Sequence, residues 1–302
     1  KQHLENANAG NKNYIYQLFK SPSRLDTLSV SIEEALLKES WDIITFQQAS
    51  HHSGLESTYD PHLFRLMRYV EAMNPNPNTI LGFHMTWAYQ QTSTHSGFAN
   101  YDKSQQKMYQ MITDTVKNEV LPISQLQFVI PSGTAIQNAR TSYIGDKLTA
   151  DGYHLTDPLG RYIAALMFYR TLIGEELSLE KVEFRPNGID KTQQLMAYEA
   201  VNNAFNKPFE VTNSTYLEAP EPEPIEVNGL PFSYTLVPGY WNTNATEITN
   251  GGSAFDLQFS ASNVIPKALL PVGSEIVVEP GYKYRVIFFE KIGDQFKVVH
   301  RT

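Results

Sequence analysis

Short apolar runs alternate with helical patterns over residues 41–173, and this order restricts the fold more than any other feature of the chain. The predicted strands are 41–48, 79–87 and 126–130, and the predicted helices are 61–73, 101–120 and 159–173. Strands that alternate with helices pair in parallel through right-handed crossovers. We therefore expect an α/β fold, a flavodoxin-like three-layer α/β/α sandwich with a parallel sheet. The run at 41–48 should be a central strand, buried on both faces.

The flanking segments add elements to this domain. Residues 14–19 are rich in strand formers and predict an edge strand. Ser31 and Glu34 have the spacing of a capping box, which predicts a short helix over 35–37. Apolar residues at helical spacing predict one more helix over 190–205. We assign residues 1–217 to the α/β domain.

The last part of the chain has a different character. Residues 218–225 are rich in Pro and Glu and predict an extended linker. Short β-type runs separated by Gly-containing turns follow over 226–302, and their spacing predicts a small antiparallel β-sandwich. We expect the aromatic side chains of this module in its core first and as a carbohydrate platform second.

Composition limits the classes of partner and chemistry. The net charge of −8 and the lack of basic runs argue against nucleic acid or an anionic membrane as a partner. No apolar run approaches the ~20 residues that a membrane-spanning helix requires. The chain has no Cys, which removes disulfides, thiolate catalysis and Cys-ligated metals. We expect no cofactor.

Asp151 and His154 form the strongest candidate for catalytic chemistry. They stand three residues apart in a loop that contains Gly152, so a tight turn can bring the carboxylate onto one imidazole nitrogen. Such a carboxylate fixes the tautomer of the ring and leaves the other nitrogen free to take a proton. The alternative is that His154 caps a turn and Asp151 is an ordinary loop residue.

The sequence around this pair resembles a known superfamily. Residues 148–162, Leu-Thr-Ala-Asp-Gly-Tyr-His-Leu-Thr-Asp-Pro-Leu-Gly-Arg-Tyr, are similar to the last catalytic block of SGNH (GDSL-like) esterases, where Asp-x-x-His supplies two members of a Ser-His-Asp triad. Residues 41–54 and 84–89 resemble a little-characterised gut-bacterial branch of that superfamily. The resemblance spans residues 1–175. It implies that His154 is the general base, that Asp151 orients it, and that the protein is secreted or belongs to the cell envelope.

Two other blocks of the superfamily depart from its pattern here. Where the superfamily has Gly-x-Asn-Asp, residues 46–49 read Phe-Gln-Gln-Ala. An amide side chain is kept, so Gln48, or otherwise Gln47, is expected to donate to an oxyanion. The alternative for either is an amide bonded to neighbouring loop backbone.

The nucleophilic serine is the larger departure. The chain contains no Gly-Asp-Ser or Gly-Asn-Ser, so the serine block, with the first strand that carries it, either lies upstream of this chain or never existed. The resemblance, which begins at residue 1, favours the first explanation. Ser50, Ser53 and Ser132 are near the expected site, but none has glycines on both sides, as the sharp turn of a nucleophile requires.

Several His and aromatic residues follow the predicted strands. His51, His84, Trp87 and Tyr89 are expected to line a substrate cleft, with burial as core aromatics as the alternative. His51 and His52 should point to opposite sides of an extended segment. No metal is expected, because neither His-x-x-x-His nor a Glu partner at helical spacing is present.

These features lead to two hypotheses. The first is an SGNH-like serine esterase that acts on a small-molecule or carbohydrate ester or O-acetyl group, with the serine absent from this chain, which alone would be inactive. The second is a non-catalytic surface protein that binds carbohydrate or protein on a degenerate SGNH scaffold. The linker and the β-rich module motivate the second.

Overall fold

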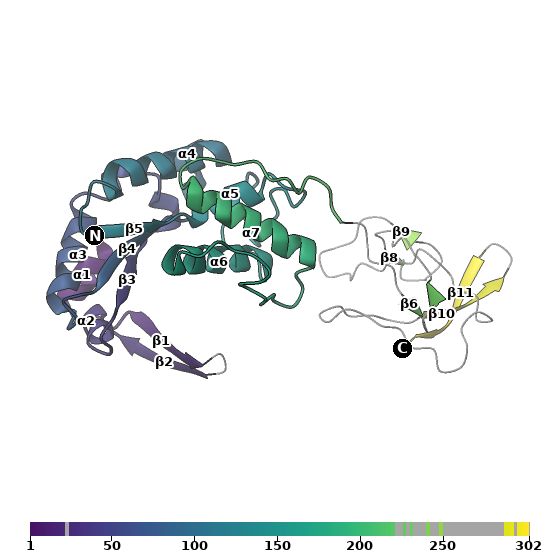
Figure 1. Cartoon of the computed structure of the whole chain (residues 1–302), viewed down its shortest axis with the longest axis horizontal. Coiled ribbons are helices and arrows are strands. Elements are labelled where there is room, and N and C mark those ends of the chain that lie inside the picture. The colour runs from purple at the N-terminus through teal and green to yellow at the C-terminus, as the bar shows by residue number, and fades with distance from the viewer. Residues whose placement is uncertain are drawn as a thin grey trace. The chain divides into compact units, whose positions relative to one another are not determined.

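The computed structural model describes residues 1–21 and 24–220, and beyond them only short strand segments. Two compact units are distinguished, Lys1–Glu218 and Ala219–Thr302. The first unit contains a three-stranded parallel sheet with helices around it (Figure 1). The predicted α/β architecture with a parallel sheet is therefore confirmed, and this core fits a flavodoxin-like arrangement.

The sheet has the order β3-β4-β5, where β3 spans Ile43–Phe46, β4 spans Ile80–His84 and β5 spans Leu126–Ile130. Each strand lies inside a predicted run. β4 is central and β3 is at an edge, so the prediction that 41–48 forms a central strand is wrong. The exposure of β3 agrees, since Ile43 is 37% exposed. An apolar run indicates a buried environment but does not determine which neighbours a strand has.

Helices cover both faces of this sheet. They are α3 (His62–Met73), α4 (Gln105–Thr115), α5 (Ser132–Ala139), α6 (Leu159–Ile173) and α7 (Lys191–Asn206). Phe83 of β4 belongs to the apolar core formed with α3 and α4, whereas the next residue, His84, contacts Phe168 of α6. Successive strand residues point to opposite faces. The helices α5, α6 and α7 form a second core around Ile130 of β5.

The helix ends follow local signals in the sequence. α3 ends at Asn74, whose extended backbone is the conformation favoured before a proline such as Pro75. α6 ends at Gly174 with φ +80°, a left-handed conformation that suits glycine. The helix predicted over 101–120 begins later, because Asp102 and Lys103 have positive φ. α4 then starts after Ser104, whose side chain accepts from the N–H of Lys107, and a π-helical turn, Val116–Val120, continues it.

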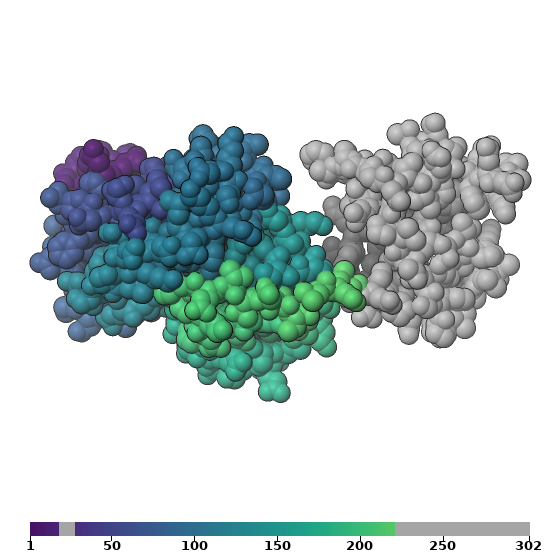
Figure 2. Space-filling model, turned by 90° about the horizontal axis from the view of Figure 1, so that it is seen from above, coloured from purple at the N-terminus to yellow at the C-terminus, as the bar shows by residue number. Residues whose placement is uncertain are grey.

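The N-terminal segment consists of two short helices and a two-stranded hairpin. The predicted strand at 14–19 is β1 (Tyr14–Ser21), which pairs with β2 (Arg24–Val30) in a two-stranded antiparallel sheet. The capping box at Ser31 and Glu34 is confirmed and opens α2 (Ile32–Leu36). Neither α1 (Gln2–Asn8) nor β2 is apparent from hydrophobic periodicity. Figures 1 and 2 place the first residues at one end of this unit and α7 at the other.

The second unit is described only through short strands. They are β6 (Glu226–Val227), β7 (Leu230–Pro231), β8 (Tyr240–Trp241), β9 (Ile248–Thr249), β10 (Ile287–Ile292) and β11 (Gln295–Arg301). They pair two by two in antiparallel fashion. The β-sandwich predicted for 226–302 otherwise lies outside the described residues and stays a prediction. Within the described part of the chain, no helix combines the length and apolar character needed to cross a bilayer.

Candidate functional site

The Asp151–His154 pair is in direct contact. Oδ2 of Asp151 lies 2.6 Å from Nδ1 of His154, and Oδ1 accepts the backbone N–H groups of His154 at 2.8 Å and Tyr153 at 3.1 Å. These bonds, led by the backbone N–H of His154, lower the pKa of Asp151 to about 2. The carboxylate is therefore ionised at neutral pH, and it favours the tautomer of His154 that carries its proton on Nδ1.

The backbone of the loop explains why the contact forms. Ala150 N–H donates to the carbonyl of His154 at 2.9 Å, and Thr149 bridges to Leu155, so the chain reverses tightly around Asp151. Gly152 has φ +93°, a conformation that a residue with a Cβ rarely adopts. The local turn therefore brings the two side chains within reach of each other, as expected from the spacing of the two residues.

His154 is open to solvent. Its side chain is 70% exposed and that of Asp151 is 44% exposed. Neither residue lines the cavities that follow the outer edges of β3 and β5. Nε2 of His154 is thus accessible to a molecule arriving from solvent, although the ring does not sit in an enclosed crevice.

A series of aromatic ring contacts, here called the ring chain, joins His154 to the loops that follow β3 and β4. Its members are His154, Tyr153, His95, Tyr89 and His51. Tyr153 lies 4.2 Å from His154 and 4.8 Å from His95, measured between ring centroids. His95 in turn lies 5.0 Å from Tyr89 and 5.7 Å from His51. The loops that follow β3 and β4 therefore meet the Asp151–His154 loop beyond the carboxyl ends of these strands, where open parallel sheets place their binding sites.

The histidine pair at 51–52 differs from its prediction. The segment is a 3-10 turn, η1 (Ser50–His52), rather than an extended strand. Successive side chains on such a turn are about 120° apart, not 180°. The two rings consequently lie 4.0 Å apart in contact with each other. Burial and the neighbouring His51 lower the pKa of His52.

Ser50 is the most accessible of the serines considered. Its Oγ lies 2.9 Å from the hydroxyl of Tyr89, and among the described residues no hydrogen bond joins it to His154. Ser53 is 2% exposed and Ser132 is fully buried. The latter two are therefore out of reach of a substrate in this structure.

Gln47 and His84 form a second polar contact, on the face of the sheet covered by α6. Nδ1 of His84 lies 2.5 Å from Oε1 of Gln47. His84 is 7% exposed, and its burial lowers its pKa to about 4, so the ring is neutral at pH 7. Nε2 of His84 has no hydrogen-bond partner among the described residues.

The structure places the remaining predicted residues as follows. The amide nitrogen of Gln48 donates to the carbonyl and hydroxyl oxygens of Thr58, and its oxygen accepts the N–H of Ala49, so both ends of this amide are used within the loop. Tyr89 is fully buried as a core aromatic. Trp87 is half-buried and donates from Nε1 to the carbonyl of Tyr153.

Three residues that contribute to this region, Tyr153, Asp146 and Arg140, were not singled out in the sequence. Tyr153 lies inside the Asp-x-x-His motif and links its histidine to His95. Its aromatic side chain in a polar loop was the available signal. Asp146 and Arg140 support the same loop and carry no local signal at all. The described residues contain no group of three or more His, Cys, Asp or Glu side chains arranged to hold a metal ion.

Comparison with known proteins identifies the family. Residues 1–204 match the model of DUF4886, a domain of unknown function. The chain belongs to the DUF4886 family. A DUF4886 family protein from Bacteroides uniformis ATCC 8492, whose crystal structure was determined at 1.50 Å, is 38% identical with a TM-score of 0.68, over 72% of this chain and 83% of that chain. No curated protein matches the sequence.

A second solved structure is more distant. It is a protein of Slackia heliotrinireducens described as a candidate SGNH hydrolase, 19% identical with a TM-score of 0.32, over 46% of this chain and 70% of that chain. A similarity of this size carries no functional argument. The case for SGNH chemistry in this DUF4886 chain must come from its own residues.

Proposed function

We propose that this chain supplies the general base and its orienting carboxylate to an SGNH-type esterase, with esters or O-acetyl groups of carbohydrates as the substrate class. The contact of 2.6 Å between Asp151 and Nδ1 of His154 carries the proposal. With Nδ1 protonated, Nε2 is free to accept a proton, and this side chain is 70% exposed. A general base must be reachable by the group that it deprotonates.

The reaction would follow the two-step course of serine hydrolases. Nε2 of His154 takes the proton of a serine hydroxyl while that oxygen attacks the ester carbonyl, and Asp151 stabilises the imidazolium that forms. The proton then passes to the departing alcohol, which leaves an acyl-enzyme. Water, deprotonated by the same nitrogen, releases the acid and restores the serine.

One edge of β3 has no strand partner among the described residues, and this edge supports a serine that comes from another polypeptide segment. A cavity of about 460 Å³ is lined by all five residues 43–47. Consecutive strand residues point to opposite faces, so a cavity that touches all of them follows the edge of the strand. β4 occupies the other edge. The further walls are mainly apolar and include Leu36, Trp41 and Val70.

An apolar strand added at this edge would end near Gln47, where the loops of the ring chain begin. This is the place where a serine at its carboxyl end would be presented to the site. The oxyanion role of Gln48 stays a prediction, and it would require the amide to leave Thr58.

The test is hydrolysis of p-nitrophenyl acetate and of an acetylated oligosaccharide by the complete gene product. We expect His154→Ala to lower kcat/KM by about 10² to 10⁴, the usual contribution of a general base, and Asp151→Asn to lower it as well. His62→Ala removes an imidazole outside the ring chain and serves as the matched control. Equal rates for the parent and His154→Ala, or no ester turnover by the complete gene product, would overturn the proposal.

One observation favours a second candidate, a non-catalytic binding protein. Among the described residues no serine is hydrogen-bonded to His154, so this part of the chain shows no nucleophile paired with the base. Titration of residues 225–302 with glycans would separate the candidates. Glycan binding together with unchanged hydrolysis in His154→Ala is the outcome expected for a binding protein.

A further inference from the structure

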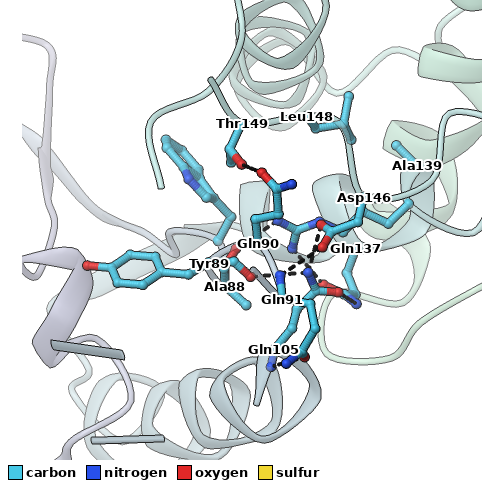
Figure 3. A network of polar contacts seen from close by, with 12 residues as sticks. Ala88, Tyr89, Gln90, Gln91, Gln105, Gln137, Ala139, Asp146, Leu148 and Thr149 are labelled. Carbon is cyan, nitrogen blue, oxygen red and sulfur yellow. Dashed lines mark hydrogen bonds and ion pairs between the residues drawn. The ribbon is translucent and has the colours of Figure 1, made fainter. Parts of the chain in front are cut away.

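The loop that carries Asp151 begins at an ion pair between the buried Arg140 and the partly exposed Asp146, whose side chains are 4% and 31% exposed. Oδ1 of Asp146 lies 2.9 Å from Nε of Arg140 and accepts the side-chain amide of Gln105 at 2.7 Å. Its Oδ2 accepts the backbone N–H of Gln91 at 2.8 Å. Figure 3 shows Gln91, in the chain after β4, and Gln105 of α4 beside the Asp146 carboxylate. Arg140 directly follows α5.

The guanidinium of Arg140 is buried, and all three of its nitrogens contact protein acceptors. Its side chain is 4% exposed, and its two terminal nitrogens donate to the carbonyl of Ala88 and to Oε1 of Gln137, both at 3.0 Å. Burial lowers the pKa of Arg140 to about 10, and Asp146 opposes that shift, so the guanidinium remains charged at neutral pH. A buried charge that loses its partner is strongly disfavoured.

The rest of the loop is hydrogen-bonded to residues 87–91, the segment that also contains Gln91. Thr149 donates from its hydroxyl to Oε1 of Gln90, and the N–H of Gln90 donates to the carbonyl of Gly152, both at 2.8 Å. Trp87 donates from Nε1 to the carbonyl of Tyr153 at 2.8 Å. Residues 87–91 therefore hold the loop on both sides of Asp151, and the ion pair anchors its first residue.

We propose that Arg140 and Asp146 are positioning residues for the Asp151–His154 pair. The ion pair fixes the loop against residues 87–91, and the loop keeps the Asp151 carboxylate on Nδ1 of His154. The importance of this positioning for catalysis rests on the proposed function. The effect of the ion pair on the tautomer of the His154 imidazole does not depend on that function. Neither residue contacts a substrate or a reacting atom in the proposed reaction.

The experiment measures the tautomer of His154 by ¹⁵N NMR of the imidazole nitrogens at neutral pH. The parent is expected to hold the proton on Nδ1, and Asp151→Asn defines the value for a ring that has lost its carboxylate. We expect Asp146→Asn to move the His154 signals at least half of the way to that value. A change in stability alone would not alter the tautomer of an exposed ring.

Glu199→Gln is the matched control. Glu199 accepts several hydrogen bonds from Ser214 and Thr215 and closes another loop onto α7, so its loss should lower stability without changing the His154 signals. If Asp146→Asn does not fold, Thr149→Val removes the hydrogen bond from Thr149 to Gln90 while leaving the ion pair intact. That variant should produce a smaller shift in the same direction.

The outcomes separate the two proposals. Parent-like His154 signals in a folded Asp146→Asn protein, or in Thr149→Val where only that variant folds, would overturn the positioning role, whatever the esterase activity. A tautomer shift in a protein whose hydrolysis does not depend on His154 would support the positioning role and remove the proposed function. A shift of the same size in Glu199→Gln would also overturn the assignment.

Discussion

At the scale of single residues, two histidines show how position sets chemistry. His154 is 70% exposed in its side chain and meets a carboxylate, whereas His84 is 7% exposed as a residue and meets the neutral amide of Gln47. Burial without a charged partner disfavours the protonated ring, which lowers the pKa of His84 to about 4. The same residue type is therefore a candidate base at one position and a neutral core group at the other.

The pKa of His84 predicts a pH dependence of folding. The unfolded chain takes up this proton near pH 6.5 and the folded chain only near pH 4. The contribution to stability is therefore complete above pH 6.5 and is lost as the pH falls through this window. Between about pH 7 and about pH 4.5, the free energy of unfolding should fall by roughly 2 kcal/mol more in the parent than in His84→Gln.

Urea denaturation of both proteins at the two pH values measures this difference. His62→Gln is the control, because it removes an imidazole at a less buried position. If the free energy of unfolding changes equally with pH in the parent and in His84→Gln, the pKa of His84 is not lowered in the folded protein.

At the scale of elements, the start of α5 is packed onto the chain that leaves β4. The N–H of Gly133 donates to the carbonyl of Met85 at 2.9 Å, and the N–H of Met85 donates to the carbonyl of Ile130 at 3.0 Å. A Cβ on Gly133 would lie 2.2 Å from the carbonyl oxygen of Thr86. This helix can reach the sheet so closely because the residue has no side chain.

We expect Gly133→Ala to lower the free energy of unfolding by about 1 to 3 kcal/mol, because a backbone oxygen cannot rotate away as a side chain can. Gly10→Ala is the comparison, since Gly10 has φ +64° but no atom within 4 Å of the added Cβ. Its cost should be limited to about 1 kcal/mol for the left-handed backbone. Chemical denaturation of the two variants measures both free energies of unfolding. A smaller decrease for Gly133→Ala than for Gly10→Ala would contradict this prediction.

At the scale of the whole molecule, the apolar cores of the described residues belong to one unit. Both cores lie within Lys1–Glu218, one around α3 and α4 and the other around α5, α6 and α7. A unit with its own core can fold alone. The candidate site, the ring chain and the Arg140–Asp146 pair also lie within this unit.

Residues 1–218 expressed alone should therefore unfold in one cooperative transition. We expect a Tm within about 2 °C of the corresponding transition in the full chain, because no described core residue is removed. Circular dichroism melting of both proteins makes the comparison. A Tm lower by more than about 5 °C would mean that the second unit contributes to the stability of the first.

Local signals in the sequence were sufficient for much of this protein. The strand runs, the capping box at Ser31, the end of α3 before Pro75 and the contact between Asp151 and His154 all depend on residues close together in the chain. Periodicity, caps and three-residue spacings express short-range geometry, which brings residues close in the chain within reach of each other, while packing decides how firmly a loop holds that geometry. These features could be inferred from residue order alone.

Only the tertiary structure decided the rest. The edge position of β3, the burial of His84 and Tyr89, and the pairing of Arg140 with Asp146 depend on how the crossovers and helices pack. An apolar run or a charged residue is compatible with several neighbours, and its own sequence does not select among them. The sequence alone thus determined the catalytic candidate pair, and packing determined what supports it and which surface of it meets solvent.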